Sequence, residues 1–173
     1  MYPAFMKSYK WLVDGLERLE LWISTFLLGV LILLVLLEVV SRYLLNRPFP
    51  WVLELSTVLI TYIIFIGIPA MYKGRSLVII EFVFNRLSEK TRKTIAFLWE
   101  LLIGFFFVYL MFASYQFMEV QMRYRSPGLD IPVAYFTLPL VFCSISMLIF
   151  NFYFILGHLE TFLKGERGQG KSL

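Results

Sequence analysis

The stretch Ser41–Leu55, SRYLLNRPFPWVLEL, is charged and broken by proline, and it separates two long apolar runs. The run before it covers 21–40 and the run after it covers 52–71. Pro48 and Pro50 have no backbone N–H, and each biases the residue before it towards extended geometry, so one helix cannot pass through both runs. The stretch therefore predicts a tight turn between two membrane-spanning helices.

The composition indicates a membrane protein. Of the 173 residues 60% are hydrophobic, and they are gathered into four blocks of roughly 20 residues or more. Each block can cross a hydrocarbon core of ~30 Å as a helix, whereas the alternation typical of barrel strands is absent. We predict a single all-α membrane domain. Its four transmembrane helices are expected at 21–45, 51–72, 94–121 and 132–156.

Two other segments have one apolar face. The first, 4–20, repeats apolar residues at helical spacing, and the second, 76–87, is too short to span a membrane. We expect two amphipathic interfacial helices there, with a frayed leader as the alternative for 4–20. The Gly-rich, charged end of the chain, 165–173, is expected to be a flexible tail.

The basic residues predict the orientation. Twelve of the 16 Lys and Arg residues lie before the first span, between the second and third spans, or after the fourth. The two remaining turns hold the other four. The excess of positive charge on cytoplasmic loops then places both termini in the cytoplasm and the proline-containing turns outside.

The sequence contains no motif that indicates catalysis or cofactor binding. The sequence has no G-x-S-x-G, H-E-x-x-H or phosphate-binding loop. A single cysteine, Cys143, and a single histidine, His158, exclude an internal disulfide, a multi-cysteine metal site and a haem with two histidine ligands from this chain. We expect no enzyme activity, no bound cofactor and no metal site. A membrane anchor for a redox complex would need cofactor ligands that are missing.

Charged residues lie near the ends of the predicted spans. Glu38 and Arg42 are four residues apart, so they share a helix face and can pair. Trp51 is an interfacial aromatic, and Glu54 is expected in the first turn of its helix, where a negative charge complements the helix dipole. Glu100 lies near the start of the third span.

A charge inside a membrane is a candidate transport residue, so two functions stay open. In one the chain is a scaffold and these charges are structural. In the other it is an independent small channel or transporter that uses its intramembrane glutamates. The central thirds of the spans are mainly Leu, Ile, Val and Phe, which favours the scaffold. Gly67, towards the end of the second span, indicates a bend or tight helix packing.

Several motifs together resemble the small membrane subunit, DctQ-like, of TRAP transporters. They are RYLLNRPFPWVLEL at Arg42–Leu55, Gly67, KGRS from Lys73, SPGLDIP at Ser126–Pro132, and the Leu-Pro pair at 138–139. Their order and spacing cover about 21–154. The chain departs from the pattern where Arg-Ser-Leu at 75–77 replaces a Gly-His pair of many members, which leaves no histidine role there.

This resemblance implies a stator in the bacterial inner membrane. Such subunits pair with a large membrane subunit that carries the substrate and sodium sites and moves as an elevator. A periplasmic binding protein delivers an organic acid to the outer face. The overall sequence is similar to unfused small subunits of sialic acid systems, which implies that substrate. Glu38, Arg42, Arg47, Trp51 and Glu54 would then organise the outer hairpin near the docked binding protein.

Overall fold

The computed structural model describes residues 2–44, 46, 49–74 and 89–169. These ranges form four α-helices, with a single isolated β-bridge and no longer strand among them. The helices are α1 (Tyr2–Leu44), α2 (Pro50–Lys73), α4 (Glu89–Gln121) and α5 (Ala134–Gln169). Each contains a stretch long and apolar enough to cross a membrane. The prediction of an all-α protein with four such helices is confirmed.

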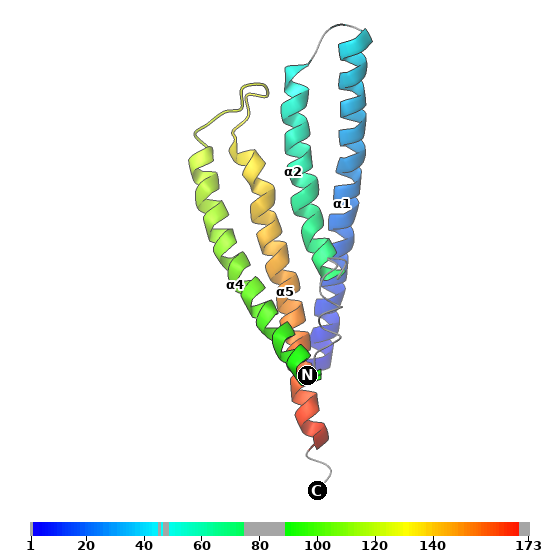
Figure 1. Cartoon of the computed structure of the whole chain (residues 1–173), viewed down its shortest axis with the longest axis vertical. Coiled ribbons are helices and arrows are strands. Elements are labelled where there is room, and N and C mark those ends of the chain that lie inside the picture. Colours follow the sequence, from blue (N-terminus) through cyan, green and yellow to red (C-terminus); the bar gives the residue numbers. More distant parts are fainter. Residues whose placement is uncertain (1, 45, 47–48, 75–88, 170–173) are drawn as a thin grey trace.

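The helices lie in a row, in the order α1, α2, α5, α4 (Figure 1). α1 packs on α2, α2 on α5 and α5 on α4, and α1 makes a smaller contact with α5. Near the N-terminus the helices converge, while at the opposite end the α1–α2 and α4–α5 hairpins spread apart (Figure 1). The row leaves α1 and α4 at its two edges.

α5 provides more of the buried residues than any other helix. Cys143, Ser144, Ser146, Met147 and Phe150 of this helix are all buried. Small and weakly polar side chains allow helices in a membrane to approach closely, because lipid offers no hydrophobic driving force for their association. The edge helices differ: the most apolar stretches of α1 and α4 contain no buried residue.

α1 is a single helix. It is continuous at Leu21, where the predicted interfacial helix was expected to end and the first transmembrane helix to begin. Its first half packs on α5: the Tyr9 hydroxyl donates to the Ile149 carbonyl at 2.9 Å, and Val13 is fully buried. With 43 residues at 1.5 Å each, α1 is about 65 Å long, roughly twice the thickness of the hydrocarbon core. Part of α1 therefore extends beyond the hydrocarbon.

Other helix ends also differ from expectation, by two residues at the start of α5 and by 13 at its end. α2 begins at Pro50 after an extended Phe49, as the proline pair predicts, but its first turn holds no acidic residue. Glu54 therefore follows that turn, and its predicted place within it was wrong. α5 begins two residues after Pro132, which pairs with Arg125 in a β-bridge, and it continues to Gln169 through the first part of the expected tail. The predicted interfacial helix 76–87 lies outside the described residues.

Candidate functional site

The Glu54 carboxylate binds the loop that connects α4 to α5. It accepts hydrogen bonds from the Ser126 hydroxyl, the Gly128 N–H at 2.9 Å and the Leu129 N–H at 3.0 Å. A methyl group on Gly128 would lie 2.9 Å from the Glu54 Cδ, so a side chain there would displace the carboxylate. We call these four residues the loop cluster. It joins the start of α2 to the loop between α4 and α5, the end where the hairpins spread apart.

The loop is also braced internally. The Ser126 N–H donates to the Ile131 carbonyl at 2.8 Å, and the Val133 N–H donates to the Tyr124 carbonyl at 2.9 Å. Asp130 has a φ of 51°, in the left-handed region that Asp and Asn tolerate better than most residues. The loop therefore has a defined shape, with Glu54 as its anchor on the neighbouring hairpin.

At the other end, three helices meet in a polar cluster of Tyr72, Glu100 and Asn151. The Asn151 Nδ2 donates to the Glu100 carboxylate and backbone carbonyl, both at 2.9 Å, and contacts the Tyr72 hydroxyl at 3.2 Å. The Tyr72 hydroxyl donates to the Glu100 carboxylate. A methyl on Gly104 would lie 2.7 Å from the Asn151 Oδ1, so α4 and α5 are close there. This three-helix cluster links α2, α4 and α5.

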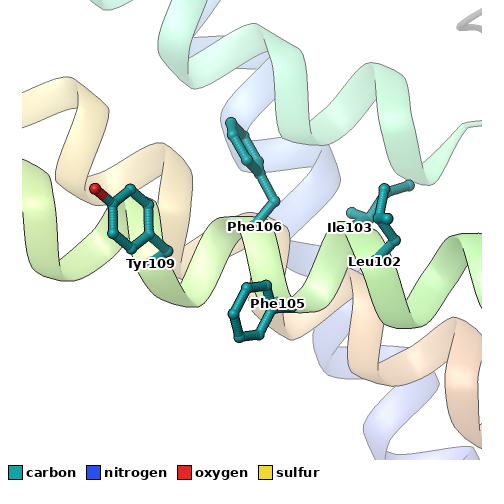
Figure 2. Close-up of a pocket in the computed structure, with 5 residues that line it drawn as sticks. All are labelled: Leu102, Ile103, Phe105, Phe106 and Tyr109. Atoms are coloured by element: carbon teal, nitrogen blue, oxygen red, sulfur yellow. The ribbon is translucent and has the colours of Figure 1, made fainter.

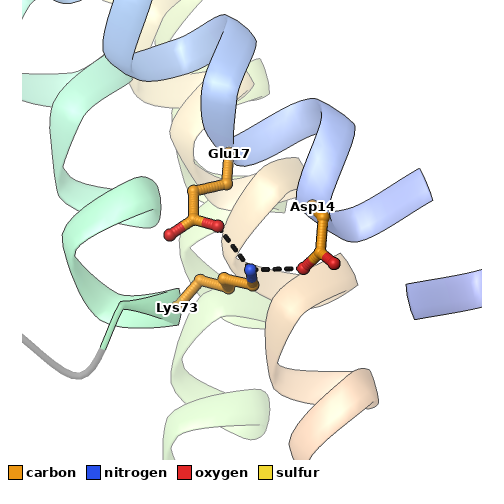
Figure 3. A network of polar contacts seen from close by, with 3 residues as sticks. All are labelled: Asp14, Glu17 and Lys73. Carbon is orange, nitrogen blue, oxygen red and sulfur yellow. Dashed lines mark hydrogen bonds and ion pairs between the residues drawn. The ribbon is translucent and has the colours of Figure 1, made fainter. Parts of the chain in front are cut away.

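Lys73 forms the lysine cluster with two acidic residues of α1 (Figure 3). Its Nζ lies 2.5 Å from the Asp14 carboxylate and also donates to the Glu17 carboxylate. The last residue of α2 is thereby joined to α1. Asp14 and Glu17 are three residues apart, so they present both carboxylates to the same neighbouring helix.

The predicted pair of Glu38 and Arg42 is present, with the Arg42 guanidinium donating to the Glu38 carboxylate. The pair lies within α1, and the Arg42 side chain is 58% exposed. Trp51 is exposed and its ring lies 6.0 Å from that of Phe49. Arg47 lies outside the described residues. A role for any of these residues in contacting a partner stays a prediction.

Gly67 fits tight helix packing, one of the two readings that its position indicated. A methyl there would lie 3.2 Å from the Ser24 Oγ and 3.9 Å from its Cβ. The Ser24 hydroxyl donates to the Ile63 carbonyl at 3.0 Å, which fastens the middle of α1 to α2. α1 and α2 are therefore in close contact along much of their length.

The sequence analysis missed most of the partners in these clusters. Asp14 and Glu17 lie in 4–20, for which the sequence predicts an interfacial helix and no ion pair, and it predicts no role for Tyr72 or Asn151. A polar Asn within an apolar block was the available signal, because an uncompensated amide in hydrocarbon is costly. Glu54 and Glu100 each bond to partners that the sequence did not predict, and the two glutamates lie in different clusters.

The described residues hold no group of three or more His, Cys, Asp or Glu side chains that could bind a metal ion. A shallow hollow on α4 is lined by Leu102, Ile103, Phe105, Phe106 and Tyr109 (Figure 2). Apart from one phenol, its lining has no group that would recognise an organic acid. The polar groups of the three clusters described above bond to groups of this chain and hold its helices together.

Comparison with known proteins gives the family. The family model described as "Tripartite ATP-independent periplasmic transporters, DctQ component" matches residues 31–161, more than half of the chain. No curated protein matches the chain. The matched range contains the loop cluster, the three-helix cluster and all of α2. The chain therefore belongs to the DctQ family and is a multi-pass membrane subunit of a transporter, the small component of a tripartite ATP-independent periplasmic (TRAP) system, rather than an enzyme.

Proposed function

We propose that this chain is the stator of its transporter: a small scaffold subunit that braces the large, moving membrane subunit. DctQ components work in TRAP systems with a large membrane subunit and a substrate-binding protein. The observation that carries the proposal is that polar clusters join the helices at both ends. The loop cluster joins the hairpins at one end, and the three-helix and lysine clusters join all four helices at the other.

The edges of the row support this role. Large apolar side chains are exposed along α1 and α4, including Leu33 at 69% and Phe105 at 79%. Such surfaces are stable only against lipid or another membrane protein. A braced row with two apolar edges can present one edge to the large subunit and the other to lipid, which widens the static part of the complex.

The outer side is proposed to receive the binding protein. The loop held by Glu54 exposes Arg123 and Tyr124, together with an ion pair between Arg125 and Asp130 at 3.3 Å. Charged groups at a rim steer association and set its register. With the excess of basic residues on the opposite side, we place this loop and Arg47 in the periplasm and both termini in the cytoplasm of a bacterial inner membrane.

The complete system is proposed to be a sodium-coupled importer of an organic acid, with sialic acid as the first substrate to test. The sequence resemblance to sialic acid systems supports that choice. The large subunit would use the sodium gradient, and this chain needs no cofactor of its own.

The alternative, an independent channel or transporter, would use Glu38, Glu54 and Glu100. Each of these carboxylates is bonded to groups of this chain in a separate place. A transport path needs polar groups that follow one another through the membrane. The observed bonding therefore favours the stator.

A disulfide between α1 and α2 tests the stator directly. A Cβ on Gly67 lies 3.9 Å from the Ser24 Cβ, which is suitable for a disulfide. We expect the variant Ser24→Cys, Gly67→Cys, made with Cys143→Ser, to support the same uptake oxidised as reduced, because a stator does not change its internal packing. The matched controls are the two single-cysteine variants. Uptake that is lost on oxidation and restored by reductant would refute the proposal.

A further inference from the structure

Glu20 is the one acidic side chain of the described core that is fully buried without a bonded partner. Its exposed fraction is 0%, and neither carboxyl oxygen makes a hydrogen bond of normal geometry. Asp14 and Glu17, about two turns and one turn earlier in α1 respectively, both bind Lys73. Glu20 therefore differs from its acidic neighbours in having no cation.

The groups around Glu20 come from α1 and α5. The hydroxyl of Ser146 on α5 lies close enough to interact with the carboxyl, and Cys143, one turn earlier on α5, also interacts with it. Glu17 on α1 adds a nearby negative charge. On α2, Lys73 is engaged by Asp14 and Glu17 (Figure 3). Among the residues that the structure describes, none of the groups that interact with Glu20 supplies a positive charge.

An ionised carboxylate that is buried without a cation is very costly, and such a group takes up a proton instead. A metal cation is a poor substitute, because it needs several oxygen ligands and no cluster of metal-binding side chains occurs in the described residues. A cation from a partner protein cannot reach Glu20 unless α1 and α5 separate, because its own chain already covers it.

We propose that Glu20 is a proton-binding site between α1 and α5, which is occupied at neutral pH and whose neutral carboxyl shares a hydrogen bond with Ser146. The proton lets α1 pack on α5 without a buried charge. Release of that proton at alkaline pH would place a negative charge beside Ser146 and weaken this packing. The inference concerns the packing of this chain alone, so it does not depend on the stator proposal.

Infrared spectroscopy of the purified full chain, in a detergent free of esters, tests the proposal. The wild-type spectrum at neutral pH should contain the carbonyl stretch of a protonated carboxyl, which shifts in D2O and is absent in Glu20→Gln. The matched control is Glu38→Gln, because Glu38 is paired with Arg42 and its loss should leave the band unchanged. The band should decrease as the pH is raised into the alkaline range.

Ser146→Ala provides a second measurement that does not require Glu20 to be replaced. If the two residues share a hydrogen bond, this variant keeps the protonated-carboxyl band but shifts its frequency. A band that Ser146→Ala leaves unshifted would overturn the shared hydrogen bond. A neutral-pH spectrum with no protonated-carboxyl band would overturn the proton site, whichever variants fold.

Discussion

Removing the Asn151 side chain should weaken the fold more than any other single neutral substitution in the three-helix cluster. Asn151 is 2% exposed, and its Nδ2, which carries two N–H groups, lies within hydrogen-bonding distance of two oxygens of Glu100 and of the Tyr72 hydroxyl. Hydrogen bonds between helices in membrane proteins contribute about 0.6 kcal/mol each, so the two bonds that the amide can donate at once amount to about 1 kcal/mol. With some lost packing, Asn151→Ala should lower the free energy of unfolding by about 2–3 kcal/mol.

That loss is a factor of about 30 to 150 in the folding equilibrium. It can be measured by titrating the protein in mixed micelles with a denaturing detergent and following helicity by circular dichroism. The matched control is Ser114→Ala: Ser114 is also buried, but its hydroxyl bonds to the Leu110 and Met111 carbonyls of its own helix. This control should change the free energy of unfolding by less than about 0.5 kcal/mol.

A double-mutant cycle separates the bonds from the packing. Tyr72→Phe removes the hydroxyl that bonds to both Glu100 and Asn151, so it should couple to Asn151→Ala by about 0.5 kcal/mol or more. Equal stability of Asn151→Ala and the Ser114→Ala control would refute the view that this cluster holds the three helices together. Strict additivity of the two cluster variants would show that they do not act through shared bonds.

Two further predictions concern the charges of α1. Lys73→Met should leave two carboxylates of α1 without their cation and lower the free energy of unfolding in the same titration by about 1–3 kcal/mol. Arg123→Met, which removes an exposed charge at the opposite end of the row of helices, is the control, and an equal effect of both changes would contradict the lysine cluster. Arg42→Ala should leave the isolated chain folded but lower the yield of the complex with the large subunit and its uptake, because Glu38 then lies unpaired beside hydrocarbon. Unchanged yield and uptake would show that the pair is incidental.

The spans were predictable because their physical cause is local. A run of apolar residues long enough to cross the hydrocarbon forms a helix, since its backbone groups have no other partners in lipid. The turn before α2 was equally local: Pro50 begins the helix after an extended Phe49. Both features depend on residues that are neighbours in the sequence.

The continuity of α1 was harder to predict. The change from an amphipathic to an apolar pattern at Leu21 indicated two segments, but no proline lies near it to end a helix. Contacts that favour one helix come from α5, where Tyr9 bonds to the Ile149 carbonyl and its ring packs on those of Phe152 and Tyr153. Such contacts depend on how two distant helices are aligned.

The same reason explains the missed partners. The sequence shows that Glu54, Glu100 and Asn151 are polar groups near or within apolar blocks, but not which of them lie at the same depth on facing helices. Glu54 was predicted to stabilise the dipole of its own helix, whereas it binds a loop more than 70 residues away. The burial of Glu20 likewise depends on packing outside α1, so no pattern within α1 distinguishes it from Asp14 or Glu17.

Reconstituted uptake tests the central claim most directly. Proteoliposomes would contain this chain alone, the large membrane subunit alone, or both, each with the binding protein, an inward sodium gradient and labelled sialic acid or another organic acid. The stator account predicts uptake only when both membrane subunits are present. Uptake by this chain alone would contradict it and would return Glu38, Glu54 and Glu100 to consideration as transport residues.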